Sequence, residues 1–304
     1  WCNCKEFWII PRIHMKKNVE SILVIGLGMI GSSIALAAKL KGLNVYGYDS
    51  LKTSLNSALK KNIVDEAFFS IDEINYKELS KKIDLVVVAV PPKVTPIVFK
   101  NIEELWNTST TITDTSSVKN HIKIDNVNNI ILSHPIAGSH KSGLDAVDAK
   151  LFINKKNIIC DPFNSDKNHL LRLQNFWSDA LQMRNSIMSV KDHDLVFAMT
   201  SHLPHLLSYA LIDSIRLSQT NVEDNAGGGL KEFLRLSASN PEMWSDIFTL
   251  NRVDLIKALA GVQVSINNLL ELITETKELP DVFNHLEMLK KELDEIKNYK
   301  EENF

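Results

Sequence analysis

The first half of the chain alternates short apolar runs, rich in β-branched residues, with longer stretches of helical periodicity. Apolar runs of this length, bounded by turn-forming residues, are typical of buried strands. The pattern predicts strands over residues 21–25, 44–48, 84–90, 110–113, 130–133, 157–160 and 184–190, and helices over 32–41, 51–61, 94–106 and 167–181. Strands separated by helices favour a parallel sheet with crossover helices, so this half is expected to be an α/β domain.

Beyond residue 190 the strand signals stop. The remaining pattern predicts helices over residues 194–215, 230–236, 241–272 and 282–299. We therefore expect a boundary near 190, with the α/β domain over residues 15–190 and an all-α domain over residues 191–304. Residues 1–14 contain two Trp, two Cys and no Met, and are interpreted as a non-native or disordered leader before a natural start at Met15.

Charge and composition exclude several classes of partner. The chain has 34 basic and 37 acidic residues, so its formal net charge of −3 gives no positive field to attract nucleic acid or an anionic membrane. No apolar run approaches the roughly 20 residues that cross a bilayer. Three cysteines offer no disulfide framework. We expect a cytoplasmic protein with no nucleic-acid or membrane partner.

Three of the eleven glycines, Gly26, Gly28 and Gly31, follow the first predicted strand and open the first predicted helix. Gly26 permits a tight turn, Gly28 lets the backbone approach a pyrophosphate, and Gly31 allows the helix to pack closely on the strand. The N–H groups at the start of the helix are also available to an anion. The context predicts a Rossmann-like dinucleotide site, to which Met29 and Ile30 of the same turn contribute.

Asp49 follows the second predicted strand, about twenty residues after the glycines, as the dinucleotide fingerprint requires. Its carboxylate would accept hydrogen bonds from ribose hydroxyls and repel a 2′-phosphate, so NAD is expected. Lys52 could partly offset this repulsion, which leaves NADP as the alternative. Val90 and Pro91 end the strand predicted over 84–90 and are assigned to the cofactor site, with a plain loop as the competing interpretation.

Polar side chains follow two further predicted strands. Ser117 lies in the segment Asp-Thr-Ser-Ser-Val-Lys after residue 113, and His134 begins the segment His-Pro-Ile-Ala-Gly-Ser-His-Lys-Ser-Gly after residue 133. The carboxyl ends of the strands are the usual functional edge of such a sheet. We therefore expect both side chains at the site.

The helical half has its own candidates. His202 and His205 lie three residues apart on one helix face, and Arg235 follows a triple glycine. The two histidines lack a companion carboxylate at a defined spacing, so no metal site is expected. Each of them, and His193 before them, is either a hydrogen-bonded core residue or part of a catalytic site.

Six segments in this order, GLGMIGSS, AVPP, DTSSVK, HPIAGSHKSG, SHLPH and GGGLKEFLRLSASNPEMW, carry a resemblance. Between about Val19 and Leu272 the chain resembles the prephenate/arogenate dehydrogenase family of tyrosine biosynthesis. The resemblance implies a Rossmann-like N-terminal domain and an all-α C-terminal dimerisation domain, hence a homodimer. It also implies oxidative decarboxylation of a small cyclohexadienol substrate by an oxidoreductase that uses NAD.

The resemblance also implies roles for single residues. His134 matches the catalytic histidine of the family, and Ser117 matches the serine that hydrogen-bonds near it. The residues matched to substrate binding are His205, Arg235, Trp244, His140 and Ser139. The family's Asp after the triple glycine is Glu232 here.

The expected activity is the NAD-dependent conversion of prephenate to 4-hydroxyphenylpyruvate. Many relatives have an acidic residue where this chain has His140; an imidazole offers no negative charge to the ammonium of arogenate, so prephenate is favoured over arogenate. Arogenate dehydrogenase is the first alternative. Another Rossmann-type hydroxyacid dehydrogenase and a non-catalytic NAD-binding regulator are two more.

The last predicted helix carries Leu286, Leu289, Leu293 and Ile296 at spacings of three, four and three residues. This apolar stripe either packs on the helix's own domain or contacts another subunit.

Overall fold

The computed structural model describes residues 19–70, 74–138, 143, 146–218, 222, 226–275 and 279–303. A five-stranded parallel sheet with the order β3-β2-β1-β4-β5 forms the centre of the α/β part. Its strands are β1 (Ser21–Ile25), β2 (Asn44–Tyr48), β3 (Glu66–Phe68), β4 (Leu85–Val88) and β5 (Thr111–Asp114). The predicted Rossmann-like parallel sheet is confirmed, and the bounds of β1 and β2 are those predicted.

The helices of this part pack on both faces of the sheet. They are α1 (Met29–Leu40), α2 (Lys52–Lys60), α3 (Tyr76–Leu79), α4 (Thr95–Asn101) and α5 (Lys167–Asn175), which continues as a π turn over Phe176–Ala180. Side chains of α1, α2 and α5 share one apolar cluster with Ile22 and Val24, whereas side chains of α3 and α4 share a second cluster with Leu23 and Ile25. This alternation along β1 is what a strand buried on both faces requires.

One expected helix is divided in the structure, and two short elements were not expected. The helix predicted over residues 94–106 is divided into a 3₁₀ turn (Pro92–Val94), α4 and a second 3₁₀ turn (Glu103–Leu105). Pro92 and Pro96 lack backbone N–H groups, so they are tolerated only in the first turn of each of these elements. The short elements β3 and α3 are absent from the sequence prediction because neither is long enough to show a period.

A second, three-stranded sheet has the order β6-β7-β8 and comprises β6 (Leu132–Pro135), β7 (Lys156–Cys160) and β8 (Arg184–Ile187). The sequence pattern suggested one parallel sheet, but β6 and β7 are antiparallel. The described residues between them form no crossover helix, so β7 can return beside β6 in the opposite direction. An isolated bridge between Ile112 and Ile130 connects the two sheets.

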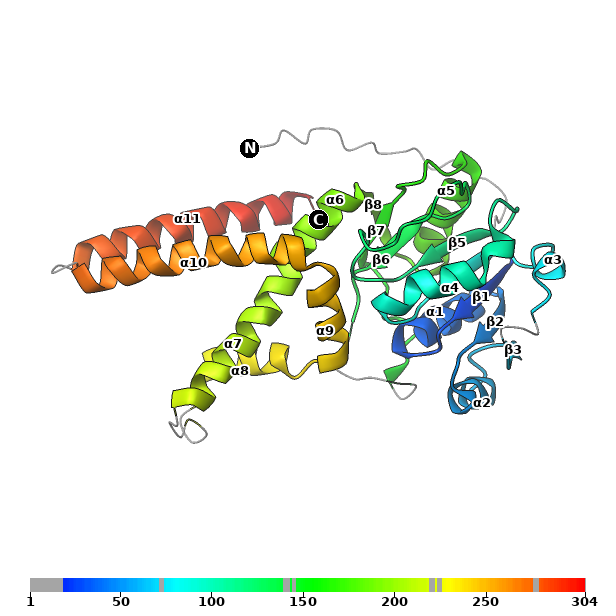
Figure 1. Ribbon diagram of the computed structural model, residues 1–304, viewed down its shortest axis with the longest axis horizontal. Helices are drawn as coiled ribbons and strands as arrows, with labels where there is room; N and C mark the ends of the chain where they lie inside the picture. The colour runs from blue at the N-terminus through cyan, green and yellow to red at the C-terminus, as the bar shows by residue number, and fades with distance from the viewer. Residues whose placement is uncertain are drawn as a thin grey trace.

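The helical part comprises α6 (Val190–Phe197), a π turn (Ala198–His202), α7 (Leu203–Ser218), α8 (Gly228–Ser237), α9 (Pro241–Leu250), α10 (Arg252–Glu275) and α11 (Leu279–Asn303). Figure 1 shows α10 and α11 side by side as a long pair that extends away from the sheets, while α9 lies between α8 and the α/β part. The single helix predicted over residues 241–272 is therefore wrong, because it is divided at Asn251. The side chain of Asn251 bonds back to α6 and to the π turn that follows it.

The described residues cover the apolar stripe on α11 only in part. Leu286, Leu289 and Leu293 are 51%, 40% and 47% exposed. About half of each side chain is thus covered and half is exposed, so packing on its own domain and a subunit contact both stay open.

Candidate active site

The glycine turn between β1 and α1 has the conformation that its sequence predicts. Gly26 has a φ of +95°, and a Cβ added to it would lie 2.4 Å from the backbone oxygen of Ala89. A Cβ on Gly31 would lie 1.9 Å from the backbone oxygen of Gly26, whereas one on Gly28 would meet no atom within 4 Å. The first two glycines are thus required by packing, and the open space at Gly28 permits close approach of a ligand.

The start of α1 adds the electrostatic part of this cradle. Gly28 is the N-cap, no side chain caps the helix, and its first turn contains no acidic residue. Met29 and Ile30 form this first turn and are partly exposed. The helix N-terminus therefore fits a pyrophosphate, which N–H groups and the helix dipole favour.

Asp49 directly follows β2 and holds the glycine turn. Its Oδ2 accepts the N–H of Leu27 at 2.7 Å, and its Oδ1 accepts the N–H of Leu51 at 2.8 Å. Each carboxylate oxygen keeps a second lone pair that can accept a ribose hydroxyl. Val90 lies beside the same turn: its Cγ1 would be 2.9 Å from a Cβ added to Gly26. Pro91, the next residue, is exposed.

The register of the sheet connects this cradle to the second polar region. Ile25 pairs with Val88, and Val88 pairs with Asp114, so β1, β4 and β5 end at one edge. Asp114 Oδ1 accepts the N–H of Ser133 at 3.1 Å, which ties the residue before His134 to this edge. His134 itself lies inside β6 rather than after it, which corrects the predicted strand end at residue 133.

A buried ion pair fixes the backbone at this position. Lys119 and Asp114 are both fully buried, and Lys119 Nζ lies 2.6 Å from Asp114 Oδ2. The same ammonium donates to the backbone oxygen of Ser133 at 2.5 Å. A buried cation with two oxygen partners is stable only where all its partners are fixed, so this pair orders the ends of β5 and β6.

His134 is the first member of a hydrogen-bonded row. Its Nδ1 lies 2.9 Å from Nε2 of His193, and Nδ1 of His193 lies 2.7 Å from Oδ1 of Asp194. The ring of Phe197 packs against both imidazoles, with centroid separations of 4.6 Å. His193 and Asp194 are buried, whereas His134 is partly accessible.

The surroundings set the charges in this row. Burial, followed by the potentials of His193, Lys119 and His202, lowers the pKa of His134 well below 6.5. Burial also lowers the pKa of His193, although its bond to Asp194 acts in the opposite direction. Burial acts to raise the pKa of Asp194, but hydrogen bonds, chiefly from His193, outweigh it and lower that pKa. At neutral pH the row therefore consists of two neutral imidazoles and one carboxylate.

The remaining histidines belong to a neighbouring cluster. The ring of His205 stacks on Trp244 with a centroid separation of 3.7 Å and an interplanar angle of 21°, and its Nδ1 donates to the backbone oxygen of Ser201. His202 Nδ1 lies 3.1 Å from Nδ2 of Asn251, and burial lowers the pKa of His202 to about 4. The predicted pair of His205 and Trp244 is thus in direct contact.

Other predicted residues form no hydrogen bond with His134 among the described residues. Ser117 is partly buried after β5, but the hydrogen bond recorded for His134 goes to His193 rather than to Ser117. Arg235 lies on α8, where its Nε donates to Glu232 at 3.0 Å and its side chain is 51% exposed. Ser139 and His140 lie outside the described residues.

Asp194 is not identified from the sequence as a member of this site, and His193 is left open between core and catalysis. The adjacent His-Asp pair at the start of the helical half was the available signal, because a carboxylate beside a histidine can fix its tautomer.

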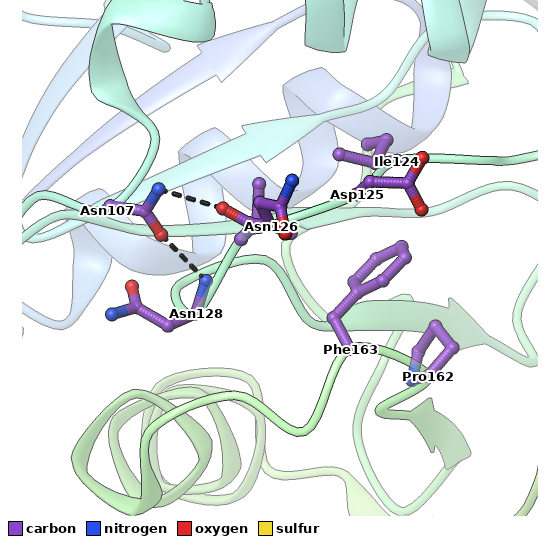
Figure 2. A pocket seen from close by; sticks show the side chains of 8 residues that line it. Asn107, Ile124, Asp125, Asn126, Asn128, Pro162 and Phe163 are labelled. Carbon is purple, nitrogen blue, oxygen red and sulfur yellow. Dashed lines mark hydrogen bonds between the residues drawn. The ribbon is translucent and has the colours of Figure 1, made fainter.

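A separate hollow of about 530 Å³ lies on the surface of the α/β part. Figure 2 shows Asn107 bonded to Asn126 and Asn128, and Asp125 and Phe163 also line the hollow. Its lining shares no residue with the row from His134 to Asp194, so it adds nothing to the candidate site.

Comparison with known proteins gives two consecutive family matches. Residues 34–183 match the family described as prephenate dehydrogenase, nucleotide-binding domain, and residues 189–291 match prephenate dehydrogenase, dimerization domain. The cyclohexadienyl dehydrogenase of Zymomonas mobilis is 32% identical over 251 residues, which cover 79% of this chain and 84% of that protein. The prephenate dehydrogenase of Bacillus subtilis is 31% identical over 257 residues, covering 78% and 66%.

A solved structure agrees with the sequence matches. The crystal structure of prephenate dehydrogenase from A. aeolicus in complex with hydroxyphenyl propionate and NAD+ superposes with a TM-score of 0.80 at 30% identity, covering 91% of this chain and 98% of that one. The glycine turn, the histidine row and these similarities lead to one assignment: the chain belongs to the prephenate dehydrogenase family.

Proposed function

We propose that this chain is a prephenate dehydrogenase that oxidatively decarboxylates prephenate to 4-hydroxyphenylpyruvate in tyrosine biosynthesis. The observation that carries the proposal is the neutral imidazole of His134 near the strand edge that also bears the glycine turn. The names of the relatives support the substrate, and the complex of the A. aeolicus enzyme supports NAD as the cofactor. A cytoplasmic location fits a biosynthetic enzyme of this kind.

His134 acts as the general base in this reaction. Prephenate carries a hydroxyl on the ring carbon that loses hydride and a carboxylate on the opposite ring carbon. His134 takes the hydroxyl proton as the C–O bond becomes a carbonyl, which contributes about 10²- to 10⁴-fold to the rate. The C–C bond to the carboxylate then breaks and carbon dioxide leaves. Its electron pair completes the aromatic ring and turns the carbonyl into a phenolate oxygen, which takes back the proton to give the hydroxyl of 4-hydroxyphenylpyruvate.

The residues at the glycine turn hold the cofactor. NAD, when bound, supplies the hydride acceptor. The N–H groups at the start of α1 bind its pyrophosphate, and Asp49 accepts its ribose hydroxyls. Val90 and Pro91 line the same edge of the sheet.

The helical part binds the rest of the substrate. We assign His205, Trp244 and Arg235 to this role, with Arg235 attracting a carboxylate through its guanidinium. We assign Ser117 to the orientation of the substrate hydroxyl, because His134 is bonded to His193 instead. Ser139 and His140, outside the described residues, complete the set on the strength of the sequence motif.

A homodimer explains the exposed apolar surface of the helical part. Segments Val190–Ser218 and Arg252–Thr274 have the length and mean hydropathy, 1.4 and 1.2, of a membrane-spanning helix, and little of either is buried. The exposed apolar side chains on α10 and α11 include Val253, Ile256, Val264, Ile266, Leu270, Ile273, Phe283, Leu286, Met288, Leu289 and Leu293. We assign this surface to a second copy of the chain rather than to a membrane. The many charged residues of α11 disfavour a membrane, and the matched family model is described as a dimerization domain.

The dimer has a direct test in sedimentation. Ile256→Glu combined with Leu289→Glu places charge on this surface, so the variant should sediment as a monomer while wild type sediments as a dimer. Leu40→Glu changes a leucine at the end of α1 that is more exposed than either of these residues, and it should leave the dimer intact. A monomeric wild type would contradict the proposal.

The activity has a test in a substrate panel. Prephenate and arogenate are each supplied with NAD or NADP, and reduced nicotinamide and 4-hydroxyphenylpyruvate are measured. The pair of prephenate and NAD should give the highest kcat/KM, and His140→Glu should shift the preference toward arogenate. A wild type that prefers arogenate, or that reduces no nicotinamide with prephenate, would overturn the proposal.

A further inference from the structure

Asp194 is a buried carboxylate with a fixed geometry. Its Oδ1 accepts the N–H of Lys119 at 2.9 Å, and its Oδ2 accepts the N–H of Asn120 at 2.8 Å. Its backbone oxygen accepts Nδ2 of Asn251 at 2.8 Å. These contacts come from the loop after β5 and from the junction of α9 with α10, so the carboxylate cannot turn away from His193.

The direction of the hydrogen bonds follows from this carboxylate. An ionised Asp194 can only accept, so Nδ1 of His193 carries the proton in their 2.7 Å bond. In neutral His193 the other nitrogen, Nε2, is then an acceptor. His134 must therefore donate from its Nδ1 in their 2.9 Å bond. A neutral His134 with its proton on Nδ1 has an unprotonated Nε2.

The remaining nitrogen of His134 is placed for chemistry. Among the described residues, no protein group is recorded as a partner of His134 Nε2. Phe197 packs on both rings of the row. The inner nitrogen is thus committed to the protein, while the outer one is left to a ligand.

We propose that His193 and Asp194 are positioning residues that fix His134 as the Nδ1–H tautomer, so that its Nε2 is the atom that takes the substrate proton. The inference rests on the proposed function for the identity of that proton. When His134 becomes an imidazolium, the bond to His193 strengthens and the negative charge of Asp194 stabilises the new positive charge. The same arrangement of a carboxylate behind a base is known to act through orientation and tautomer in other enzymes.

The tautomer can be measured without substrate. The folded enzyme, with its histidines labelled with ¹⁵N, is observed by NMR. The His134 signals are identified by their absence from the spectrum of His134→Asn. We expect a protonated Nδ1 and an unprotonated Nε2 in wild type. In His193→Leu, which removes the acceptor, His134 should lose this fixed form. In His193→Gln, whose side-chain oxygen can take the place of Nε2, the form should be retained.

Kinetics then separates positioning from simple structural support. His193→Leu should lower kcat with prephenate and NAD by about 10²-fold, with both KM values within about threefold of wild type. His193→Gln should recover kcat to within about tenfold of wild type. His169→Gln, at a half-buried histidine on α5 bonded to Thr111, is the matched control and should keep full activity.

The outcomes distinguish this inference from the proposed function. A wild type that fails to oxidise prephenate but shows the Nδ1–H form overturns the function and supports the positioning. A His134 that carries its proton on Nε2 in wild type overturns the inference. So does a folded His193→Leu with kcat within about threefold of wild type, or a His193→Gln that is folded yet as inactive as His134→Asn. If His193→Leu does not fold, the wild-type and His193→Gln spectra still decide.

Discussion

The ammonium of Lys93 lies 3.1 Å from the carboxylate of Asp246 and connects the loop after β4 to α9. The hydrogen bond to Asp246, followed by its charge, raises the pKa of Lys93. Lys93 is half exposed, but Asp246 is nearly buried, and its Oδ2 has no hydrogen-bond partner. The contact joins the cofactor side of the sheet to the helix that carries Trp244.

Removal of Lys93 should therefore loosen the contact between the two parts of the chain. Lys93→Met leaves the buried carboxylate of Asp246 without its counter-charge, so Tm should fall, and KM for prephenate should rise by a few fold. Lys81→Met breaks an exposed ion pair with Glu78 and should leave both quantities unchanged. Differential scanning calorimetry and steady-state kinetics measure the two effects. Equal Tm values for the two variants would show that the contact adds no stability.

His134 should be required for the chemical step rather than for cofactor binding. His134→Asn keeps a polar side chain of smaller size but removes the base, so kcat should fall by about 10²-fold or more. The Kd for NAD, measured by fluorescence titration, should change little, because the glycine turn is formed by other residues. A kcat within about threefold of wild type would remove His134 from the role of base.

The parts of the fold that rest on local pattern were predictable. The bounds of β1 follow from an apolar run, and those of β2 follow from a short segment rich in Val and Tyr. The conformation of Gly26 follows from the spacing of the glycines. The end of β6 could not be predicted in this way, because His134 and Pro135 give no apolar signal. Pro135 belongs to the strand because it pairs with Asn157 of β7. Pairing with the neighbouring strand, rather than local sequence, decides where such a strand ends.

The site was predictable only in part, because its contacts join distant segments. His134 was assigned from its motif, but its partner His193 lies 59 residues further along the chain and begins another part of the fold. Lysine side chains are usually exposed, and only the fold shows that Lys119 is fully buried against Asp114. No sequence pattern within one segment predicts a buried ion pair such as Lys119 and Asp114.

The buried pair of Lys119 and Asp114 should make a large contribution to stability once one partner is removed. Lys119→Met leaves a carboxylate in the core with only backbone donors, which should lower the free energy of unfolding by about 3–5 kcal/mol. Urea denaturation followed by circular dichroism measures this loss. Lys257→Met, at an exposed pair with Asp254, should cost about 1 kcal/mol or less. If the two variants lost equal stability, burial would not be the cause.

Asp49 should control the choice of cofactor. Asp49→Ser removes the carboxylate that repels a 2′-phosphate and weakens the bonds to the N–H groups of Leu27 and Leu51. The ratio of kcat/KM with NADP to that with NAD should therefore rise by about tenfold, which corresponds to about 1.4 kcal/mol. A wild type that already prefers NADP would contradict the assignment of Asp49 to the ribose.

His202 should make stability depend on pH in the acid range. Its pKa is about 4 in the folded chain, against an ordinary value of 6.5, because burial disfavours the charged ring. Between these two values the unfolded chain binds a proton that the folded chain excludes, so the free energy of unfolding rises with pH and falls on acidification from about 6.5 to about 4.

The effect of His202 can be isolated by substitution. A shift of this size corresponds to a loss of about 3 kcal/mol across that window. The pKa values of His134 and His193 are also lowered, so these two residues add to the loss in the same direction. His202→Gln keeps a polar side chain near Asn251 but cannot titrate, so the plot of unfolding free energy against pH should become shallower. Denaturation curves collected from pH 7 to about 4 measure the slope. The same slope in the variant and in wild type would mean that the proton is not excluded at His202.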